Sequence, residues 1–146
     1  MSKKIYTVQS SDKKKFDDQI NTLLEIGCEL LENTYKVIEN DDCVIFSHIV
    51  EYDSTNIIID LYDDGQLDFV QNKNEDGKQD GLSIGWYETG EKKFEGIYKD
   101  GEYIELHTYW YDDGQKKKEI IYNEDGKKIS VKEWDVWGDL IENKDE

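Results

Sequence analysis

Few residues of this chain have the types and the spacing that catalysis or metal binding requires. The chain contains two histidines, His48 and His107, and both lie in strand-like runs. Either imidazole could act as a general base or a metal ligand, but a histidine on the surface of a sheet is the more common case. The sequence has no nucleophile elbow, no phosphate-binding glycine loop and no pair of histidines at metal-ligand spacing. We therefore predict a protein that is not an enzyme.

The two cysteines, Cys28 and Cys43, lack the Cys-x-x-Cys spacing that is typical of zinc sites. We interpret them as small hydrophobic residues of a core, and a disulfide between them is left open. No apolar stretch is long enough for a signal peptide or a membrane span. A cytoplasmic protein with reduced thiols is therefore expected. An enzyme with a site around His48 and the two cysteines is the least supported alternative, because no further residues complete such a site.

One stretch, residues 72–80, has the oxygen-rich pattern of a calcium-binding loop. Gly77 lies where such a loop bends, but the twelfth position is Ser83, where calcium needs a bidentate glutamate. The flanking residues also alternate as strands do. We therefore interpret this stretch as a solvent-exposed hairpin turn, and we predict no metal and no cofactor.

The chain is strongly acidic. Among its 146 residues, 18 lysines stand against 35 aspartates and glutamates, which gives a formal net charge of −17, and there is no arginine. Without arginine the protein lacks the planar group that binds phosphates in a bidentate manner, and an acidic surface repels nucleic acids and anionic lipids. We expect neither as a partner. A basic protein is the natural electrostatic complement, although acidity that only keeps the protein soluble is an open alternative.

The first part of the chain, residues 1–60, is predicted to form a small α/β unit. Residues 5–8 are a β-prone run, and the side-chain oxygens of residues 10–12 can cap a helix. An apolar stripe indicates the helix, and Gly27 suits its C-terminal end. The stripe consists of Phe16, Ile20, Leu23 and Leu24.

Further strands are expected at residues 28–31 and 43–52, and residues 56–62 are another candidate. The predicted order is β-α-β-β, and the predicted fold class is α+β. This part resembles a small uncharacterised bacterial domain in which a helix ends in Leu-Leu-x-x-Gly and Trp-Glu-Leu follows. Residues 23–30 fit that pattern, with Cys28 at the tryptophan position. The resemblance implies no known chemistry.

The second part, residues 61–146, is repetitive. Trp86, Trp110 and Trp134 stand 24 residues apart. Two interleaved ladders of glycines have nearly the same period: Gly65, Gly90, Gly114 and Gly138, and then Gly77, Gly101 and Gly126. Each repeat has the pattern strand, glycine turn, strand, glycine turn. We therefore predict a meander of stacked β-hairpins, with a degenerate last copy at its end.

The turns have a physical basis in the six Asp-Gly pairs of the chain. The tightest hairpin turn needs a positive φ at both central residues, which aspartate tolerates and glycine adopts freely. Residues 126–134 are one residue shorter than the corresponding segments of the other repeats. A β-bulge or a frayed edge is expected there.

These repeats resemble the MORN repeat (membrane occupation and recognition nexus) in its bacterial variant form. That variant has a Trp-Tyr-x-x-Gly motif followed by Tyr-x-x-Gly. Residues 86–101 match it with Trp86, Tyr87, Gly90, Tyr98 and Gly101. The resemblance covers about residues 61–140 and implies a β-hairpin repeat fold. It also implies an antitoxin-like or immunity protein, or a scaffold, since bacterial proteins of this variant are described in these ways.

Strand alternation in residues 103–111 indicates an interaction surface, because successive side chains of a strand point to opposite faces. The face with Ile104, Leu106, Thr108 and Trp110 is predicted to be core. The other face is predicted to be exposed to solvent, and tyrosines suit interfaces. Packing beside lysine stems is the alternative. The candidate partner-binding residues are Tyr87, Tyr103, Glu105, His107, Tyr109 and Tyr111.

The favoured function is that of an immunity or antitoxin-like protein. It would block a basic toxin domain through the acidic, tyrosine-rich repeat face. The alternatives are a carbohydrate or cell-wall-binding repeat protein, whose aromatic residues stack on sugars, and a scaffold or adaptor without catalytic activity. We expect a monomer or a weak dimer in which residues 134–141 pair edge to edge.

Overall fold

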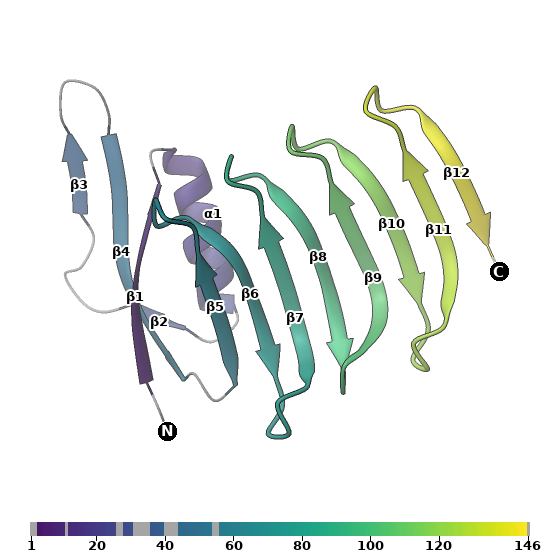
Figure 1. Ribbon diagram of the computed structural model, residues 1–146, viewed down its shortest axis with the longest axis horizontal. Coiled ribbons are helices and arrows are strands. Elements are labelled where there is room, and N and C mark those ends of the chain that lie inside the picture. Colours follow the sequence, from purple (N-terminus) through teal and green to yellow (C-terminus); the bar gives the residue numbers. More distant parts are fainter. Residues whose placement is uncertain are drawn as a thin grey trace.

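Over the residues that it describes, the computed structural model has one helix and two antiparallel sheets (Figure 1). It describes the backbone of residues 3–10, 12–25, 28–30, 36–39, 44–53 and 56–145, and the side chains of residues 12–25, 28 and 56–145. The predictions for Gly27, for Cys43 and for the side chain of His48 lie outside these described residues.

The N-terminal elements form the helix and the smaller sheet. They are β1 (Lys3–Ser10), α1 (Lys13–Glu25), β2 (Glu29–Leu30), β3 (Lys36–Glu39) and β4 (Val44–Asp53). Strand β4 is the common partner, because β1, β2 and β3 each pair with it in antiparallel orientation. The predicted β-α-β-β order is not shown, since β3 is an additional strand between the two that the sequence predicts after the helix.

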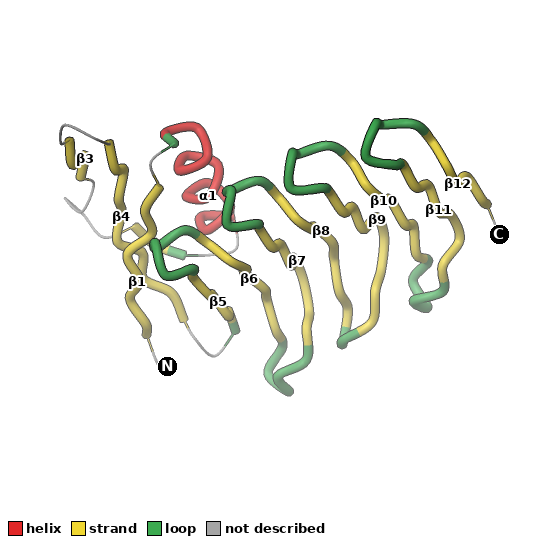
Figure 2. Tube along the Cα trace, turned by 45° about the horizontal axis from the view of Figure 1, so that its top comes forward, coloured by secondary structure: helices red, strands yellow, loops and turns green. Residues whose placement is uncertain are grey.

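The repeat region forms one eight-stranded antiparallel meander, in which each strand pairs with its neighbours in the sequence. The strands are β5 (Ile57–Leu61), β6 (Leu67–Lys73), β7 (Gln79–Trp86), β8 (Lys92–Lys99), β9 (Glu102–Trp110), β10 (Lys116–Tyr122), β11 (Lys128–Trp134) and β12 (Leu140–Asp145). The hairpins follow one another in a row that ends at β12 (Figure 2). The predicted meander of hairpins is confirmed, and it starts with β5, ahead of the predicted boundary at residue 61.

The turns of the meander are of two kinds. Asp100 and Gly101 alone connect β8 and β9, with φ angles of 52° and 92°, as expected for a two-residue hairpin turn. The longer turns place only the glycine in the left-handed region, as at Gly114, where φ is 83°. In these turns a backbone bond such as Tyr111 N–H to the Gln115 carbonyl, 2.9 Å long, closes the loop. The expectation of two positive φ angles is therefore correct at residues 100–101 and wrong at the other Asp-Gly pairs.

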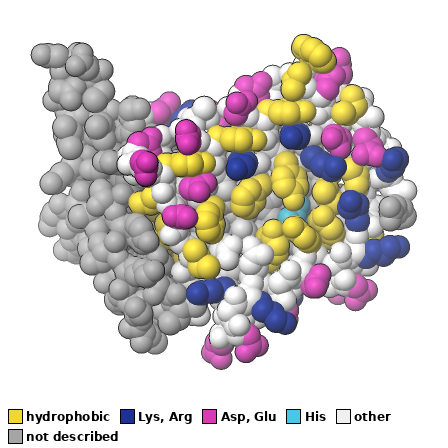
Figure 3. Space-filling model, in the orientation of Figure 1, with side chains coloured by type: hydrophobic (Ala, Val, Ile, Leu, Met, Phe, Trp, Pro, Cys, Tyr) yellow, Lys and Arg dark blue, Asp and Glu magenta, His cyan; other side chains and the backbone are white. Residues whose placement is uncertain are grey.

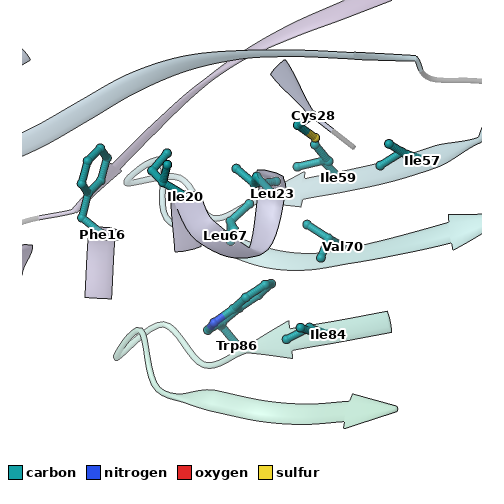
Figure 4. Packing of buried hydrophobic residues seen from close by; sticks show 10 residues of the cluster. All are labelled: Phe16, Ile20, Leu23, Cys28, Ile57, Ile59, Leu67, Val70, Ile84 and Trp86. Carbon is teal, nitrogen blue, oxygen red and sulfur yellow. The ribbon is translucent and has the colours of Figure 1, made fainter. Parts of the chain in front are cut away.

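Helix α1 begins at one of the predicted capping residues and buries the predicted stripe. The backbone N–H of Lys15 donates to the Asp12 carboxylate at 3.1 Å, and this bond lowers the pKa of that carboxyl. Phe16, Ile20 and Leu23 are buried, whereas Leu24 is exposed. The core that they enter also contains Cys28, Ile57, Ile59, Leu67, Val70, Ile84 and Trp86 (Figure 4). The helix therefore closes over β5, β6 and β7.

The side of the eight-stranded sheet that contacts α1, here called the helix side, becomes polar away from the helix. At one position of the repeat the cross-strand pair changes along the sheet from Ile59–Val70 to Ile84–Glu95, Thr108–Glu119 and Lys132–Asn143. Burial of apolar surface therefore decides where the helix lies. Among the described residues, no helix is long and apolar enough to cross a lipid bilayer.

Candidate functional site

Burial limits the reactivity of Cys28, the cysteine whose side chain the structure describes. Cys28 carries a free thiol in the core, and desolvation raises its pKa to about 11. The thiol is therefore protonated and unreactive at neutral pH, in agreement with a packing role. Within the ranges that the structure describes, no group of three or more His, Cys, Asp or Glu residues could hold a metal ion.

The calcium-like stretch forms the turn between β6 and β7. The Asn74 side-chain oxygen accepts hydrogen bonds from the backbone N–H groups of Asp76 and Lys78, at 3.1 and 3.0 Å. The Asn74 amide donates to the Asp100 carboxylate of the next turn at 2.8 Å. These polar groups therefore shape one turn and connect it to its neighbour, as the hairpin interpretation requires.

The side of the large sheet opposite α1 carries a cluster of aromatic rings, here called the aromatic face. Strand pairing places Tyr98 beside Tyr103 and His107 beside Ile120. In Figure 1 the helix lies behind the sheet, and Figure 3, in the same orientation, shows hydrophobic side chains gathered on the uncovered face among lysines and carboxylates. The aromatic face consists of Phe94, Tyr98, Tyr103, His107, Tyr109, Ile120 and Tyr122.

The imidazole of His107 lies at the centre of this cluster and is only 2% exposed. The ring centroids of Tyr98, Tyr103 and Tyr122 lie 5.2, 4.8 and 5.3 Å away, in edge-to-face orientations. Tyr103 in turn stacks on Tyr122, with centroids 5.1 Å apart. The prediction that His107 faces solvent is therefore wrong, because three tyrosine rings enclose it.

Burial also sets the protonation state of His107. Desolvation lowers its pKa below the ordinary value of 6.5, although the carbonyls of Ile97 and Ile104 favour the charged form. The Nε2 atom lies 2.8 Å from the Ile97 carbonyl oxygen, so the neutral ring donates its Nε2 proton there. A ring so placed is a structural group of the cluster, since a substrate in solvent cannot reach it.

Two features of the backbone bring the ring into this position. Gly96 lies beneath it, and a Cβ atom at that residue would overlap the imidazole. Strand β9 also bulges by two residues relative to β8, because Glu95 pairs with Thr108 but Ile97 pairs with Ile104. Glu105, within this bulge, has a φ of 59°.

The stability of the protein should depend on pH through His107. The unfolded chain binds this proton with an ordinary pKa near 6.5, and the folded chain binds it less well. The unfolded state is therefore favoured as the pH falls below about 6.5, and the stabilising contribution of the neutral ring is present above that value. Urea unfolding at pH 7.5 and at pH 5.5 should show a larger loss of stability for the native protein than for His107→Phe.

The comparison with His107→Phe is needed because the many carboxylates also titrate in acid. The same substitution at His48 measures what the second histidine contributes. If native protein and His107→Phe lose equal stability between the two pH values, the folded pKa of His107 is not lowered.

The structure separates the six predicted partner-binding residues into three groups. Tyr103, His107 and Tyr109 lie together on the aromatic face, where Tyr103 is 39% exposed. Glu105 is exposed at the bulge. Tyr87 and Tyr111 lie apart from them, in the turns that follow β7 and β9.

The turn tyrosines connect successive hairpins. The hydroxyl of Tyr62 donates to the Trp86 carbonyl at 2.7 Å, Tyr87 to Trp110 at 2.9 Å, and Tyr111 to Trp134 at 3.0 Å. Burial raises the pKa of Tyr62 to about 12, with help from the nearby Asp68 carboxylate, and the hydroxyl stays a donor. Lys93 and Lys117 lie over the rings of Tyr87 and Tyr111, at 5.6 and 5.3 Å. For these two tyrosines, packing beside lysine stems is what the structure shows.

Removing the Tyr111 hydroxyl should destabilise the array by about 1 kcal/mol, because the Trp134 carbonyl loses its donor while the ring remains. Chemical denaturation of Tyr111→Phe measures this loss. Tyr87→Phe should give a similar value, and the double variant should lose the sum of the two. If both single variants were as stable as the native protein, the hydrogen bonds from the turn tyrosines would not stabilise the contact between successive hairpins.

Sequence reasoning missed Tyr98 and Tyr122 as members of the aromatic face. They stand 24 residues apart, so the repeat period itself relates them. Burial raises the pKa of both hydroxyls, which places the two side chains within the cluster. Applying the period to tyrosines as well as to tryptophans and glycines identifies them.

A groove of about 400 Å³ lies on the helix side, between the start of α1 and the hairpin turns. Trp110 lines it, with Lys14, Lys15 and Lys92 and with the carboxylates of Asp18 and Glu91. Lys15 forms an ion pair with Glu91 at 3.0 Å. An indole beside paired charges is a surface on which a polar ring could stack.

The hairpins β7–β8, β9–β10 and β11–β12 each hold one Trp-x-x-x-Gly segment at the turn, and the β5–β6 hairpin has Leu61 in place of the tryptophan. The resemblance to the MORN repeat rests on these residues and their spacing. No protein-family model, no curated protein and no solved structure matches the chain.

Proposed function

We propose that this chain is a non-enzymatic protein-binding module of MORN-like repeats, and that it acts as an immunity or antitoxin-like protein against a basic toxin domain. The observation that carries the proposal is the aromatic face, an uncovered sheet surface on which tyrosine rings gather. Tyr103 is 39% exposed there, and its ring stacks on that of Tyr122 with centroids 5.1 Å apart. Tyrosine-rich surfaces supply contact area with little loss of side-chain entropy.

Charge supports the choice of a basic partner. The net charge of −17 favours encounter with a cationic surface and disfavours nucleic acid and anionic lipid. Blocking by occlusion needs no reacting group, and His107 is buried and already hydrogen-bonded. With this face the chain would cover the active site of the toxin domain.

The test is a tagged pull-down from the native organism at low and moderate salt, read by mass spectrometry. We expect one dominant basic protein in equimolar amount, with less recovered at moderate salt. Tyr103→Ala and Glu105→Lys should each reduce recovery at least tenfold.

Matched controls use exposed positions elsewhere. Leu24→Ser removes an exposed apolar side chain from α1, and Glu75→Lys reverses a charge in the turn between β6 and β7. Both should retain the partner. Two results would contradict the proposal: no protein is recovered at either salt concentration, or the control variants lose the partner as strongly as the aromatic-face variants do. In either case the aromatic face is not the binding surface, and the scaffold function becomes the preferred one.

A carbohydrate ligand is the second candidate, and the Trp110 groove favours it. Sugars stack on indoles and hydrogen-bond to charged side chains at the rim of such grooves. Glycan-array binding that Trp110→Ala abolishes and Tyr103→Ala leaves unchanged would replace the first proposal with this one.

A further inference from the structure

A pocket of about 520 Å³, here called the turn pocket, lies between the β8–β9 turn and the β10–β11 turn. Both turns lie at the same end of the meander (Figure 2), and they differ in length: two residues connect β8 to β9, and five connect β10 to β11. The turn pocket is lined by Lys99, Ile104, Glu105, Tyr122, Asn123 and Glu124. Because Tyr122 belongs to the aromatic face, the turn pocket is continuous with the proposed binding surface.

Contacts within the protein hold two walls of the turn pocket in place. The ring of Tyr122 stacks on Tyr103, with centroids 5.1 Å apart. The side-chain oxygen of Asn123 accepts hydrogen bonds from the backbone N–H groups of Asp125 and Lys127, at 3.1 and 2.8 Å, and these bonds fix the β10–β11 turn. Both walls are therefore ordered before a ligand binds, which lowers the entropy cost of binding.

The charges at the turn pocket favour a cation. The segments that frame it, residues 99–105 and 122–127, carry five carboxylates and two lysines. Lys99, which lines the pocket, forms an ion pair with Asp80 of β7 at 2.9 Å, so its charge is already compensated. Among the described residues, the carboxylates of Glu105 and Glu124 form no ion pair and no hydrogen bond. Two uncompensated carboxylates beside an aromatic ring are therefore left for a positively charged ligand.

Glu105 stands at the pocket in an unfavourable backbone conformation. Its φ is 59°, and the residue 24 positions earlier, one repeat before it, is Gly81 with a φ of 107°. This left-handed conformation suits glycine and is costly for a residue with a side chain. The earlier repeat has glycine at this position, whereas this repeat has an exposed carboxylate there. Local strain of this kind clusters at ligand-binding positions of proteins.

We propose that the turn pocket receives an arginine side chain of the basic protein partner, an inference that rests on the proposed function for the source of this side chain. The aliphatic part of the arginine lies on Ile104, and the planar guanidinium lies on the ring of Tyr122. Its N–H groups donate to the carboxylates of Glu105 and Glu124. A guanidinium fits this set better than an ammonium, because it stacks on aromatic rings and presents a planar fork of donors to carboxylates. The chain itself contains no arginine, so none of its own side chains can bind there in this way.

An NMR titration with short peptides tests the turn pocket without the partner. The probe is the tripeptide Gly-Arg-Gly with blocked ends. Two comparison peptides carry lysine or citrulline, the neutral analogue of arginine, in the middle position. We expect the arginine peptide to cause saturable shifts of the amide signals of residues 104–105 and 122–124. The lysine peptide should bind more weakly and the citrulline peptide should not bind, and salt should weaken the arginine peptide because the contact is between charges.

Glu124→Gln is the decisive variant, because it removes one charge from an exposed side chain and keeps its size. Its matched control is Glu75→Gln. Glu75 has the same place in an identical turn sequence, Asn-Glu-Asp-Gly, but Lys73 precedes that turn where Tyr122 precedes the other. We expect Glu124→Gln to weaken binding of the arginine peptide at least fivefold and to reduce recovery of the partner in the pull-down at least threefold. Glu75→Gln should leave both unchanged.

The proposal is overturned if no saturable shift occurs at these residues, if the citrulline or lysine peptide binds as tightly as the arginine peptide, or if the two variants behave alike. Failure of the turn pocket can be told apart from failure of the proposed function. A basic partner that Glu124→Gln retains and Tyr103→Ala loses would contradict the turn pocket alone. Binding of the arginine peptide at the turn pocket, with no partner recovered in the pull-down, would support the pocket as an arginine site and contradict the toxin-binding proposal.

Discussion

Replacing Trp86 with alanine should lower the free energy of unfolding by about 3–5 kcal/mol. The indole is 2% exposed and lies in the core beneath α1, together with Phe16 and Leu67 (Figure 4). Its removal leaves a cavity between helix and sheet, and the hydrogen-bonded strands cannot move together to fill it. Urea unfolding followed by far-ultraviolet circular dichroism measures the loss without relying on tryptophan fluorescence.

Trp134→Ala is the matched control for this experiment. Trp134 has the same position in the last hairpin, where it pairs with Leu140 as Trp86 pairs with Lys92, but it is only partly buried. The helix does not cover it, and we expect a loss of about 1 kcal/mol. Equal losses at the two tryptophans would contradict the conclusion that the helix, and not the repeat alone, makes Trp86 a core residue.

Gly96→Ala should have the second large effect, a loss of about 2–3 kcal/mol. The added methyl group would overlap the imidazole of His107, so the ring must leave its place among the tyrosines. The backbone conformation of Gly96 is accessible to alanine, and the expected loss is steric. Thermal or urea unfolding of the single variant measures it.

A double-mutant cycle shows whether the ring is the obstacle. In a His107→Ala background the space above Gly96 is open, and Gly96→Ala should then be neutral or slightly stabilising, because alanine is stiffer than glycine in the unfolded chain. A loss of the same size in both backgrounds would mean that the methyl group meets something other than His107.

These two experiments address opposite sides of one sheet. The helix side derives its stability from α1, whereas the aromatic face derives it from rings that lie over small residues, as His107 lies over Gly96 and Phe94 over Gly85. A partner-binding variant on the aromatic face must therefore be checked for folding before a loss of binding is assigned to lost contacts. Tyr103, being partly exposed, is the most suitable position for such a variant.

The meander, its turns and the helix could be predicted from the sequence because each depends on nearby residue types. Glycine in a turn adopts a positive φ wherever the turn occurs, as at Gly101 and Gly114. The apolar stripe of α1 has the spacing of one helical face, and Phe16, Ile20 and Leu23 are indeed buried. The predicted bulge near residues 126–134 is also found, where Tyr122 pairs with Lys128 and Ile121 with Ser130.

The aromatic face could be predicted only in part. Alternation places Tyr103, His107 and Tyr109 on one face, and the structure keeps them together. Strand alternation could not show that His107 is buried, because this burial depends on Gly96 of β8 and on a bulge that shifts the register of β9. The same alternation predicts Leu106 as core, yet it is 46% exposed, since it lies next to that bulge and beyond the reach of α1.

By itself, then, the sequence determined the acidic charge, the hairpin repeat and the amphipathic helix. Only the tertiary structure decided how far the helix covers the sheet, where the turn tyrosines donate, and which apolar residues of the last hairpin stay exposed. The physical reason is that charge, turn conformation and helical stripe are properties of single residues and their neighbours in the chain. Burial of His107 and exposure of Trp137 depend instead on what adjacent strands and helices place against each side chain.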